Sequence, residues 1–365
     1  MKRIRYGRVA ALVAASAVAL SACGNDPASS AAGDDGGESG LSGELAGAGA
    51  SSQEAAMEAW RAGFGANNPD VNIAYDPAGS GAGRTQFGEG AIDFAGSDAV
   101  MDDEERAAAE ERCGGPVYHL PLYISPIAVI YKLDGVEGLQ LSPATVAGIF
   151  DRKITTWNDP AIAADNPQAQ LPPTAITPVN RSDESGTTEN FTEYLSAVAP
   201  EAWTHEPSGD WPLSGGQSAQ GTSGVVQTVE GGEGTIGYAD ASKAGDLGVA
   251  KIKVGEQFVE YSPEAAAKIV DESPRVEGLN EHDVVIELQR DTTAEGTYPI
   301  VLVSYTIVCS TYSDAAKGDL VKAFVGYIAS EAGQKQAGDN AGSAPISATL
   351  RTDVEAAIES ISAGA

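Results

Sequence analysis

The stretch HLPLYISPIAVIYKL, residues 119–133, is rich in β-forming residues and is longer than an ordinary strand, which averages about 5–6 residues. Apolar residues dominate it without clean alternation, as expected for a strand that is covered on both faces. A second run of this kind, YPIVLVSYTIVCS, occupies residues 298–310. The simplest explanation of two such long runs is that each one crosses between two lobes of the protein.

Strand-like and helix-like segments alternate around these two runs. The shorter strand-like segments are LAGAGA (45–50), VNIAYDPA (71–78) and AIDFAG (91–96). The helix-like segments are QEAAMEAWRAGF (53–64), PATVAGIF (143–150), TTENFTEYLSAV (187–198), SPEAAAKIV (262–270), DAAKGDLVKAFVGYIAS (314–330) and ATLRTDVEAAIESI (348–361). This alternation predicts an α/β fold with mainly parallel sheets. With the two long runs as crossings, we expect one lobe from residues 41–124 plus 303–365 and the other from residues 125–302.

The N-terminal residues have the pattern of an export signal followed by a tether. The basic residues are Lys2, Arg3, Arg5 and Arg8, and the apolar run VAALVAASAVAL follows them at residues 9–20. This run is shorter than the roughly 20 residues of a spanning helix, so residues 1–22 are predicted to be a secretory signal peptide. Because LSAC ends at Cys23, the pattern favours a lipoprotein signal that leaves a lipidated Cys23, and an ordinary signal peptide is the alternative. Residues 23–40 lack apolar periodicity and are expected to form a flexible acidic tether.

The charge of the chain excludes some classes of partner. Its formal net charge is −30, and removal of residues 1–22 takes away four basic residues and no acidic one, which makes it −34. Binding to nucleic acid requires clustered Lys and Arg, so we expect no nucleic acid partner. Direct binding to anionic lipid is disfavoured for the same reason, and attachment to the membrane would depend on lipid at Cys23.

Two further cysteines, Cys113 and Cys309, remain in the exported part of the chain. In an oxidising compartment an even pair favours a disulfide. Two buried free thiols are the alternative, because the sequence does not give the distance between them.

Three glycine-rich turns share one design, in which Ser or Thr precedes a helix. They are GAGASSQEAAMEAW (47–60), AGSGAGRTQF (78–87) and RSDESGTTENFTEYL (181–195). A helix N-terminus leaves backbone N–H groups unpaired and carries about half a positive charge, which suits it to an anion. Glycine lets the backbone approach a ligand, and hydroxyl groups add donors. One such turn is equally an ordinary N-cap, but three that converge, with Arg181 and with Asp98 from a fourth turn, would indicate an anion site.

An ordered set of short motifs carries a resemblance to a known family. The motifs are GAGAS, GSGAG, IDFAGSDA, KITTWND (153–159), RSDESGTT, WPLSGG (211–216) and GTIGYAD (234–240). In this order and spacing, over about residues 41–350, the chain resembles the phosphate-binding lipoproteins of bacterial ABC transporters, the PstS family. The resemblance implies a two-lobed periplasmic binding protein fold of type II, with two crossover hinge strands and the ligand in the cleft between the lobes.

The resemblance also implies a set of phosphate contacts. They fall on Ser51, the backbone N–H of Ser52, Ser80 and Asp98 in one lobe, and on Arg181, Ser185, Gly186 and Thr187 in the other. Asp183 matches an acidic position that in the family pairs with the arginine and holds its guanidinium in place. Many relatives carry a threonine and an aromatic residue where this chain has Ser51 and Ser52, so an apolar lid near the ligand is expected to be missing.

A carboxylate such as Asp98 beside an anion favours phosphate over sulfate. Phosphate at neutral pH still carries a P–OH proton, which an ionised carboxylate accepts in a short charge-assisted hydrogen bond. Sulfate has no such proton and would meet Asp98 as an unpaired like charge. The alternative is that Asp98 only caps the helix that follows it.

The sequence gives little support to an enzyme. The histidines are His119, His205 and His282, none of them in a metal-ligand spacing such as HExxH. No GxSxG elbow surrounds Ser80, Ser97 or Ser185, and no dinucleotide or GxxxxGK[ST] phosphate loop occurs. We therefore expect no catalytic residue, no metal and no cofactor. A phosphatase-like enzyme, a binding lipoprotein for another oxyanion and a surface adhesin remain the alternatives.

The resemblance finally implies the partners and the location. We expect an extracytoplasmic monomer that is anchored to the cell membrane through Cys23. It would close around inorganic phosphate and deliver it to a membrane permease driven by ATPase subunits.

Overall fold

The computed structural model of the protein describes residues 40–363. The predicted signal peptide at residues 1–22, the lipidation site Cys23 and nearly all of the predicted tether at residues 23–40 lie outside the described residues. The described part of the chain thus begins just before the first predicted lobe, which starts at residue 41.

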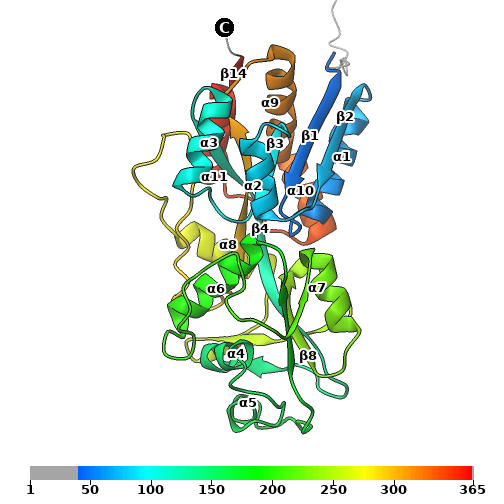
Figure 1. The fold of residues 1–365 in the computed structure, drawn as a ribbon, viewed down its shortest axis with the longest axis vertical. Coiled ribbons are helices and arrows are strands. Elements are labelled where there is room, and N and C mark those ends of the chain that lie inside the picture. The colour runs from blue at the N-terminus through cyan, green and yellow to red at the C-terminus, as the bar shows by residue number, and fades with distance from the viewer. Residues whose placement is uncertain (1–39, 364–365) are drawn as a thin grey trace, which may run out of the picture. The chain divides into compact units, whose positions relative to one another are not determined.

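A single long strand, β4 (Val117–Lys132), lies at the centre of a nine-stranded sheet. Its first part, Val117–Pro126, pairs antiparallel with β12 (Val301–Cys309), and its last part, Ile127–Lys132, pairs antiparallel with β8 (Thr235–Asp240). Every residue of β4 except Lys132 is buried, which explains why its sequence is apolar without alternation. Figure 1 shows β4 running from the upper group of elements into the lower group.

The upper group is here called the β1 half. It contains the strands β1 (Gly43–Gly49), β2 (Val71–Asp76), β3 (Phe94–Ser97) and β12, in the order β2-β1-β3-β12-β4. Its helices are α1 (Glu54–Asn67), α2 (Ser80–Gly88), α3 (Asp103–Cys113), α9 (Ala315–Ala329), α10 (Glu331–Ala341) and α11 (Ala348–Ser360). A short pair, β13 (Thr311–Tyr312) and β14 (Ser362–Ala363), lies at its end.

The lower group is here called the β8 half. It contains β8, β6 (Thr177–Arg181) and β7 (Gln217–Ala219), which are parallel to one another, and the short β9 (Gly248–Val249) beside β4. Its helices are α4 (Pro143–Phe150), α5 (Pro160–Asp165), α6 (Gly186–Val198) and α7 (Gly221–Glu230). A separate sheet joins β11 (Gln257–Val259), β10 (Lys251–Val254) and β5 (Gln140–Leu141), and η1 (Ala241–Lys243) and α8 (Pro263–Glu272) follow β8 and β11 in the chain.

The sheet is mixed, whereas the sequence predicted mainly parallel pairing. The pairs of β1 with β2 and β3, and of β6 with β7 and β8, are parallel as expected. At the centre β4 and β12 are antiparallel, because the chain enters the β8 half along β4 and returns to the β1 half along β12. The neighbouring pairs, β12 with β3 and β4 with β8, are antiparallel as well. Two passages in opposite directions that lie side by side can only pair antiparallel.

The helices bury the faces that their periodicity predicts. On α1 the buried face includes Ala56, Met57 and Trp60. On α6 the residues Phe191, Tyr194 and Leu195 are fully buried, and the Phe191 ring stacks on Tyr238 of β8 with 4.4 Å between centroids. This packing fixes the start of α6, where the predicted site residues lie, against the end of β8 and β6.

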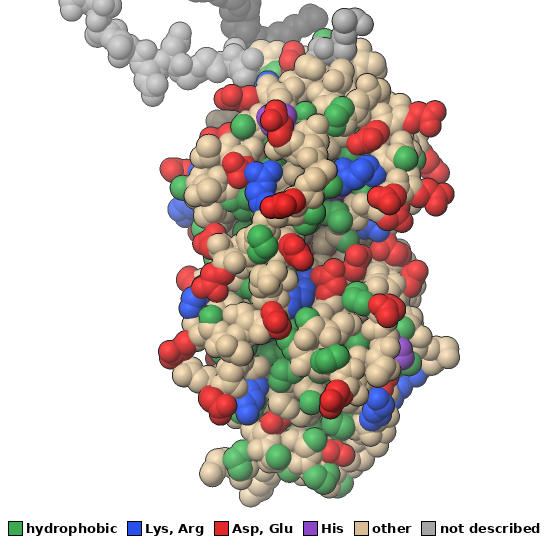
Figure 2. Space-filling model, turned by 90° about the vertical axis from the view of Figure 1, so that its left-hand side faces the viewer, with side chains coloured by type: hydrophobic (Ala, Val, Ile, Leu, Met, Phe, Trp, Pro, Cys, Tyr) green, Lys and Arg blue, Asp and Glu red, His purple; other side chains and the backbone are tan. Residues whose placement is uncertain are grey.

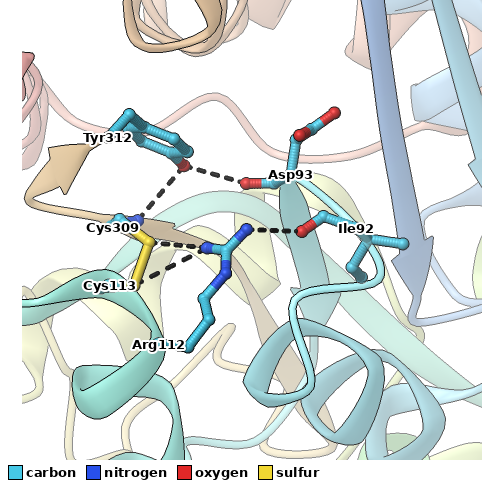
Figure 3. Close-up of a disulfide and its surroundings, with 6 residues drawn as sticks. All are labelled: Ile92, Asp93, Arg112, Cys113, Cys309 and Tyr312. Carbon is cyan, nitrogen blue, oxygen red and sulfur yellow. Dashed lines mark hydrogen bonds between the residues drawn. A yellow bond between two sulfur atoms is a disulfide. The ribbon is translucent and has the colours of Figure 1, made fainter. Parts of the chain in front are cut away.

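Cys113 and Cys309 form a disulfide with a Cα–Cα distance of 5.4 Å. It joins the end of α3 to the end of β12, so the segment between the two cysteines contains the whole β8 half. Figure 3 shows Arg112 beside it, with Nη1 donating to Cys309 Sγ at 2.7 Å and Nη2 donating to the Ile92 carbonyl at 2.9 Å. The cross-link thus ties the exit and the return of the chain together inside the β1 half.

Candidate functional site

The glycine-rich turns of the sequence lie at the ends of strands and meet between the two halves. Ser51 and Ser52 follow β1, and Asp98 follows β3. Ser80 is the first residue of α2, and Thr187 lies in the first turn of α6, which follows β6. In sheets with parallel strands the carboxyl ends of the strands form the ligand crevice, and both halves present this edge to each other here.

Asp98 joins residues from both halves. The residue is 4% exposed, its Oδ1 accepts from Ser52 Oγ at 2.6 Å, and its Oδ2 accepts from Thr187 Oγ1 at 2.9 Å. Its backbone N–H donates to Ser80 Oγ at 3.2 Å, and its carbonyl accepts from Asn190 Nδ2 of α6 at 2.7 Å. A carboxylate has about four lone-pair sites, so Asp98 retains capacity to accept further hydrogen bonds.

Gly186 allows this close approach of α6 to Asp98. A Cβ atom at Gly186 would come within 2.7 Å of Asp98 Cβ and 2.8 Å of Ser80 Oγ. No side chain fits at those distances, so glycine at this position is required for contact between the two halves.

The environment of Asp98 acts on its pKa in two directions. Burial raises the pKa of the Asp98 carboxyl and is the largest effect. The hydroxyl groups of Ser304, Ser52 and Thr187 and the positive charge of Arg181 lower it again, but the pKa stays above its ordinary value. The carboxyl is therefore a dry and poorly neutralised acceptor, which a ligand proton would stabilise.

Arg181, at the end of β6, is held in one orientation by Asp183. Its side chain is 3% exposed, Nε donates to Asp183 Oδ1 at 2.8 Å, and Nη2 donates to Asp183 Oδ2. Burial raises the pKa of Asp183, but the hydrogen bonds and the charge of Arg181 outweigh it, and the pKa is lowered overall. The fork-to-fork geometry fixes the guanidinium at the edge of the site.

The remaining predicted residues have different local roles. Ser185 is the N-cap of α6, and its Oγ accepts from the Thr188 N–H at 3.3 Å. Ser51 Oγ lies 3.0 Å from Thr222 Oγ1 and accepts from the Thr222 N–H at 3.0 Å. Asp98, in contrast, does not cap the helix after it, because Asp102 is the N-cap of α3 and forms a capping box with Glu105. Capping of the following helix, the alternative that the sequence left open, therefore does not explain Asp98.

Comparison with known proteins gives the family. A family model described as a PBP superfamily domain matches residues 29–332. The phosphate-binding protein PstS2 of Mycobacterium bovis (strain BCG / Pasteur 1173P2) is 37% identical over 378 residues, which cover 99% of this chain and 100% of that protein. The chain belongs to the PstS family of phosphate-binding proteins.

Solved structures show the fold of this PstS-family chain. The periplasmic phosphate-binding protein PfluDING, solved with phosphate, is similar with a TM-score of 0.70 at 20% identity, covering 86% of this chain and 93% of that one. A phosphate ABC transporter substrate-binding protein with bound phosphate from Clostridium perfringens has a TM-score of 0.59 at 20% identity, covering 82% and 98%. The predicted two-lobed periplasmic binding protein fold of type II is thereby confirmed.

Ser52 lies where the resemblance implies an aromatic residue in many members of the PstS family. The sequence predicted the loss of an apolar lid there, because a hydroxyl replaces an aromatic ring. In the structure Ser52 is fully buried, and its Oγ donates the 2.6 Å hydrogen bond to Asp98. The serine hydroxyl therefore orients the Asp98 carboxylate.

Sequence reasoning missed residues that complete the site. Gly221 donates its N–H to Asp183 Oδ1 at 3.1 Å, and Thr222 contacts Ser51, both from the start of α7. The stretch SAQGTSG (218–224) has the same strand, glycine and hydroxyl design as the predicted turns, so the same criterion applied there would have found it. No sequence pattern marks Asn190. Its side chain reaches the Asp98 carbonyl only because it lies one helical turn after Gly186.

Two motifs of the resemblance support the site from a distance. Trp157 of KITTWND is buried and donates to the Gly234 carbonyl at 3.1 Å. Trp211 of WPLSGG stacks near Tyr238 with 5.8 Å between centroids. The hydroxyl of Tyr238 is 2.7 Å from Thr188 Oγ1 in α6, so Tyr238, with Trp211 packed against it, positions the start of the helix.

The histidines pair with carboxylates. His119 Nδ1 lies 2.8 Å from Asp283, and His205 Nε2 lies 2.8 Å from Asp151. Within residues 40–363 no group of three or more His, Cys, Asp or Glu side chains has a geometry that could hold a metal ion. No helix in that same part of the chain combines the length and the apolar character needed to cross a membrane.

Proposed function

We propose that the protein binds inorganic phosphate between its two halves and delivers it to an ABC transporter. The observation that carries the proposal is the buried Asp98 carboxylate between Ser52 of one half and Thr187 of the other. A carboxylate at this point is costly beside a fully ionised anion and favourable beside one that can donate a proton. Phosphate at neutral pH meets this requirement, whereas sulfate does not.

The ligand contacts we propose come from both halves. The β1 half would supply Ser51, the N–H of Ser52, Ser80 and Asp98, and the β8 half would supply Arg181, Ser185, Gly186 and Thr187. Asp183 would act through Arg181, whose guanidinium it already orients. The PstS relatives support phosphate as the ligand of these residues, since the Mycobacterium bovis protein is named for phosphate binding and matches over the full chain.

The high acidity of the chain is compatible with an anion ligand. Figure 2 shows Asp and Glu side chains spread over one face, with fewer Lys and Arg among them. A surface carboxylate about 20 Å away contributes roughly 0.2 kcal/mol through water, and salt with a Debye length near 8 Å reduces this further. A charge-assisted donor in contact with the ligand contributes about 1.5–3 kcal/mol and outweighs several such charges.

Capture would proceed by closure of the two halves. We take them as the two lobes, with residues 41–124 plus 303–365 in one and residues 125–302 in the other. The change of partner along β4 at Pro126 and Ile127 supports a hinge near this boundary. Phosphate would contact one lobe first, and contacts from the second would then favour the closed state.

Delivery and location are inferred from the relatives. The Clostridium perfringens structure is described as a substrate-binding protein of a phosphate ABC transporter, and PfluDING is described as periplasmic. We infer that this protein is extracytoplasmic, anchored through lipid at Cys23, monomeric, and a donor of phosphate to a permease with ATPase subunits. Loss of phosphate uptake on deletion would support this role, and unchanged uptake would favour an adhesin.

Calorimetry on the purified protein tests the ligand. We expect saturable phosphate binding, with sulfate and molybdate weaker by about a hundredfold or more, because neither meets Asp98 with a proton in the way phosphate does. Comparable sulfate affinity would mean another oxyanion is the ligand. Incubation with a phosphomonoester separates the enzyme alternative, since turnover would contradict a pure binding role.

A further inference from the structure

Arg84 of α2 donates hydrogen bonds to three side chains, two in the β1 half and one in the β8 half. Its side chain is 8% exposed, Nε donates to Glu105 Oε2 at 2.8 Å, and Nη1 donates to Ser97 Oγ at 3.0 Å. Both of these partners belong to the β1 half. The third, Glu184, lies between β6 and α6 in the β8 half, and Nη2 donates to its Oε1 at 3.1 Å.

The position of this contact in the chain links it to the proposed ligand site. Ser97 immediately precedes Asp98, and Glu184 lies between Asp183 and Ser185. One guanidinium therefore holds the residue next to the proposed phosphate acceptor and the residue next to the proposed donors. Arg84 itself makes none of the contacts assigned to the ligand.

Two glycines form a slot for the Glu184 carboxylate. A Cβ atom at Gly81 would lie 1.5 Å from Glu184 Oε2, and one at Gly209 would lie 2.2 Å from Glu184 Oε1. Gly81 is on α2, one turn before Arg84, and the Gly209 carbonyl accepts the Ser185 N–H at 3.0 Å. Only residues without a side chain leave room for the carboxylate to reach the other half.

We propose that Arg84 and Glu184 form a latch between the halves, which slows the release of bound phosphate. A bond inside one half is present whether the halves are open or closed, so it does not alter their equilibrium. A bond between the halves exists only when they are together, so it favours the closed state alone. This inference rests on the proposed function, and it makes Arg84 a positioning residue that retains bound phosphate.

The test compares two substitutions, each of which removes one negative charge from a hydrogen-bond partner of Arg84. Glu184→Gln removes the charge of the partner across the halves, and Glu105→Gln removes that of the partner in the same half. Stopped-flow measurements with inorganic phosphate should show a release rate raised about tenfold in Glu184→Gln, because the ion pair is replaced by a hydrogen bond from the guanidinium to a neutral amide. We expect the association rate to stay within about twofold of wild type, and Glu105→Gln to change neither rate by more than that.

Gly81→Ala provides a second variant that leaves every charge in place. Alanine is favourable in a helix, so the free protein should keep its melting temperature while the blocked slot raises the release rate. Equal release rates in Glu184→Gln, Glu105→Gln and wild type, or unchanged release in Gly81→Ala, would overturn the latch. Absence of phosphate binding by the wild-type protein would instead overturn the proposed function, so the two failures are distinguishable.

Discussion

Replacement of Asp98 by asparagine should largely remove the preference of the protein for phosphate over sulfate. The substitution keeps the shape of the side chain and an amide oxygen that can accept from Ser52 or Thr187, the two hydroxyl groups that contact the carboxylate. What it removes is the negative charge that accepts the proton of phosphate and repels sulfate.

The structure sets the size of both effects. A charge-assisted hydrogen bond contributes about 1.5–3 kcal/mol, so Asp98→Asn should weaken phosphate binding by roughly 10- to 150-fold. Asp98 is 4% exposed, and two like charges at about 4 Å with an effective dielectric near 20 repel by about 4 kcal/mol. Relief of even half of that repulsion would strengthen sulfate binding by more than about tenfold. The ratio of the two affinities should therefore fall below about tenfold.

Calorimetric titration of wild type and Asp98→Asn with both anions, at one ionic strength, measures this ratio. Asp102→Asn is the matched control, since Asp102 caps α3 in the same turn and its side chain and N–H bond to Glu105 instead of to the site residues. It should leave both affinities unchanged. An unaltered phosphate-to-sulfate ratio in Asp98→Asn would refute the assignment of Asp98 as the discriminating group.

Three further predictions concern other parts of the molecule. Arg181→Ala should weaken phosphate binding by at least about tenfold in calorimetry, because it removes a buried charged donor; wild-type affinity would show that Arg181 is not in the site. Burial raises the pKa of Asp240 to about 6 in the folded protein, so the folded state binds the proton more tightly and the free energy of unfolding should fall as pH rises from about 4 to 6. Urea denaturation over this range should show that this decline is smaller in Asp240→Asn, where Tyr123 can still donate to the amide oxygen. Reduction of the disulfide, or replacement of Cys113 and Cys309 by serine, should lower the free energy of unfolding by about 2–5 kcal/mol in the same assay, and an unchanged midpoint would contradict a stabilising role.

Local features of the chain were predictable from the sequence. The strand and helix segments follow from apolar periodicity, which reports the environment of neighbouring residues only. Glycine next to Ser or Thr before a helix marked the turns at Ser51, Ser80 and Ser185, and the long run at residues 119–133 marked the central strand. The chemistry of the ligand came from the resemblance, because its ordered motifs carry information that no single turn has.

Contacts between distant residues were decided by the tertiary structure. Asp98 meets Thr187 over 89 residues of sequence, Arg84 meets Glu184 over 100, and Ser51 meets Thr222 over 171. A sequence pattern gives the preferences of each segment, but which segments meet depends on the packing of the whole core and on the antiparallel return of the chain. The sequence by itself thus determined which turns are suited to an anion, and only the packing of the two halves brought the carboxylate and its donors into one site.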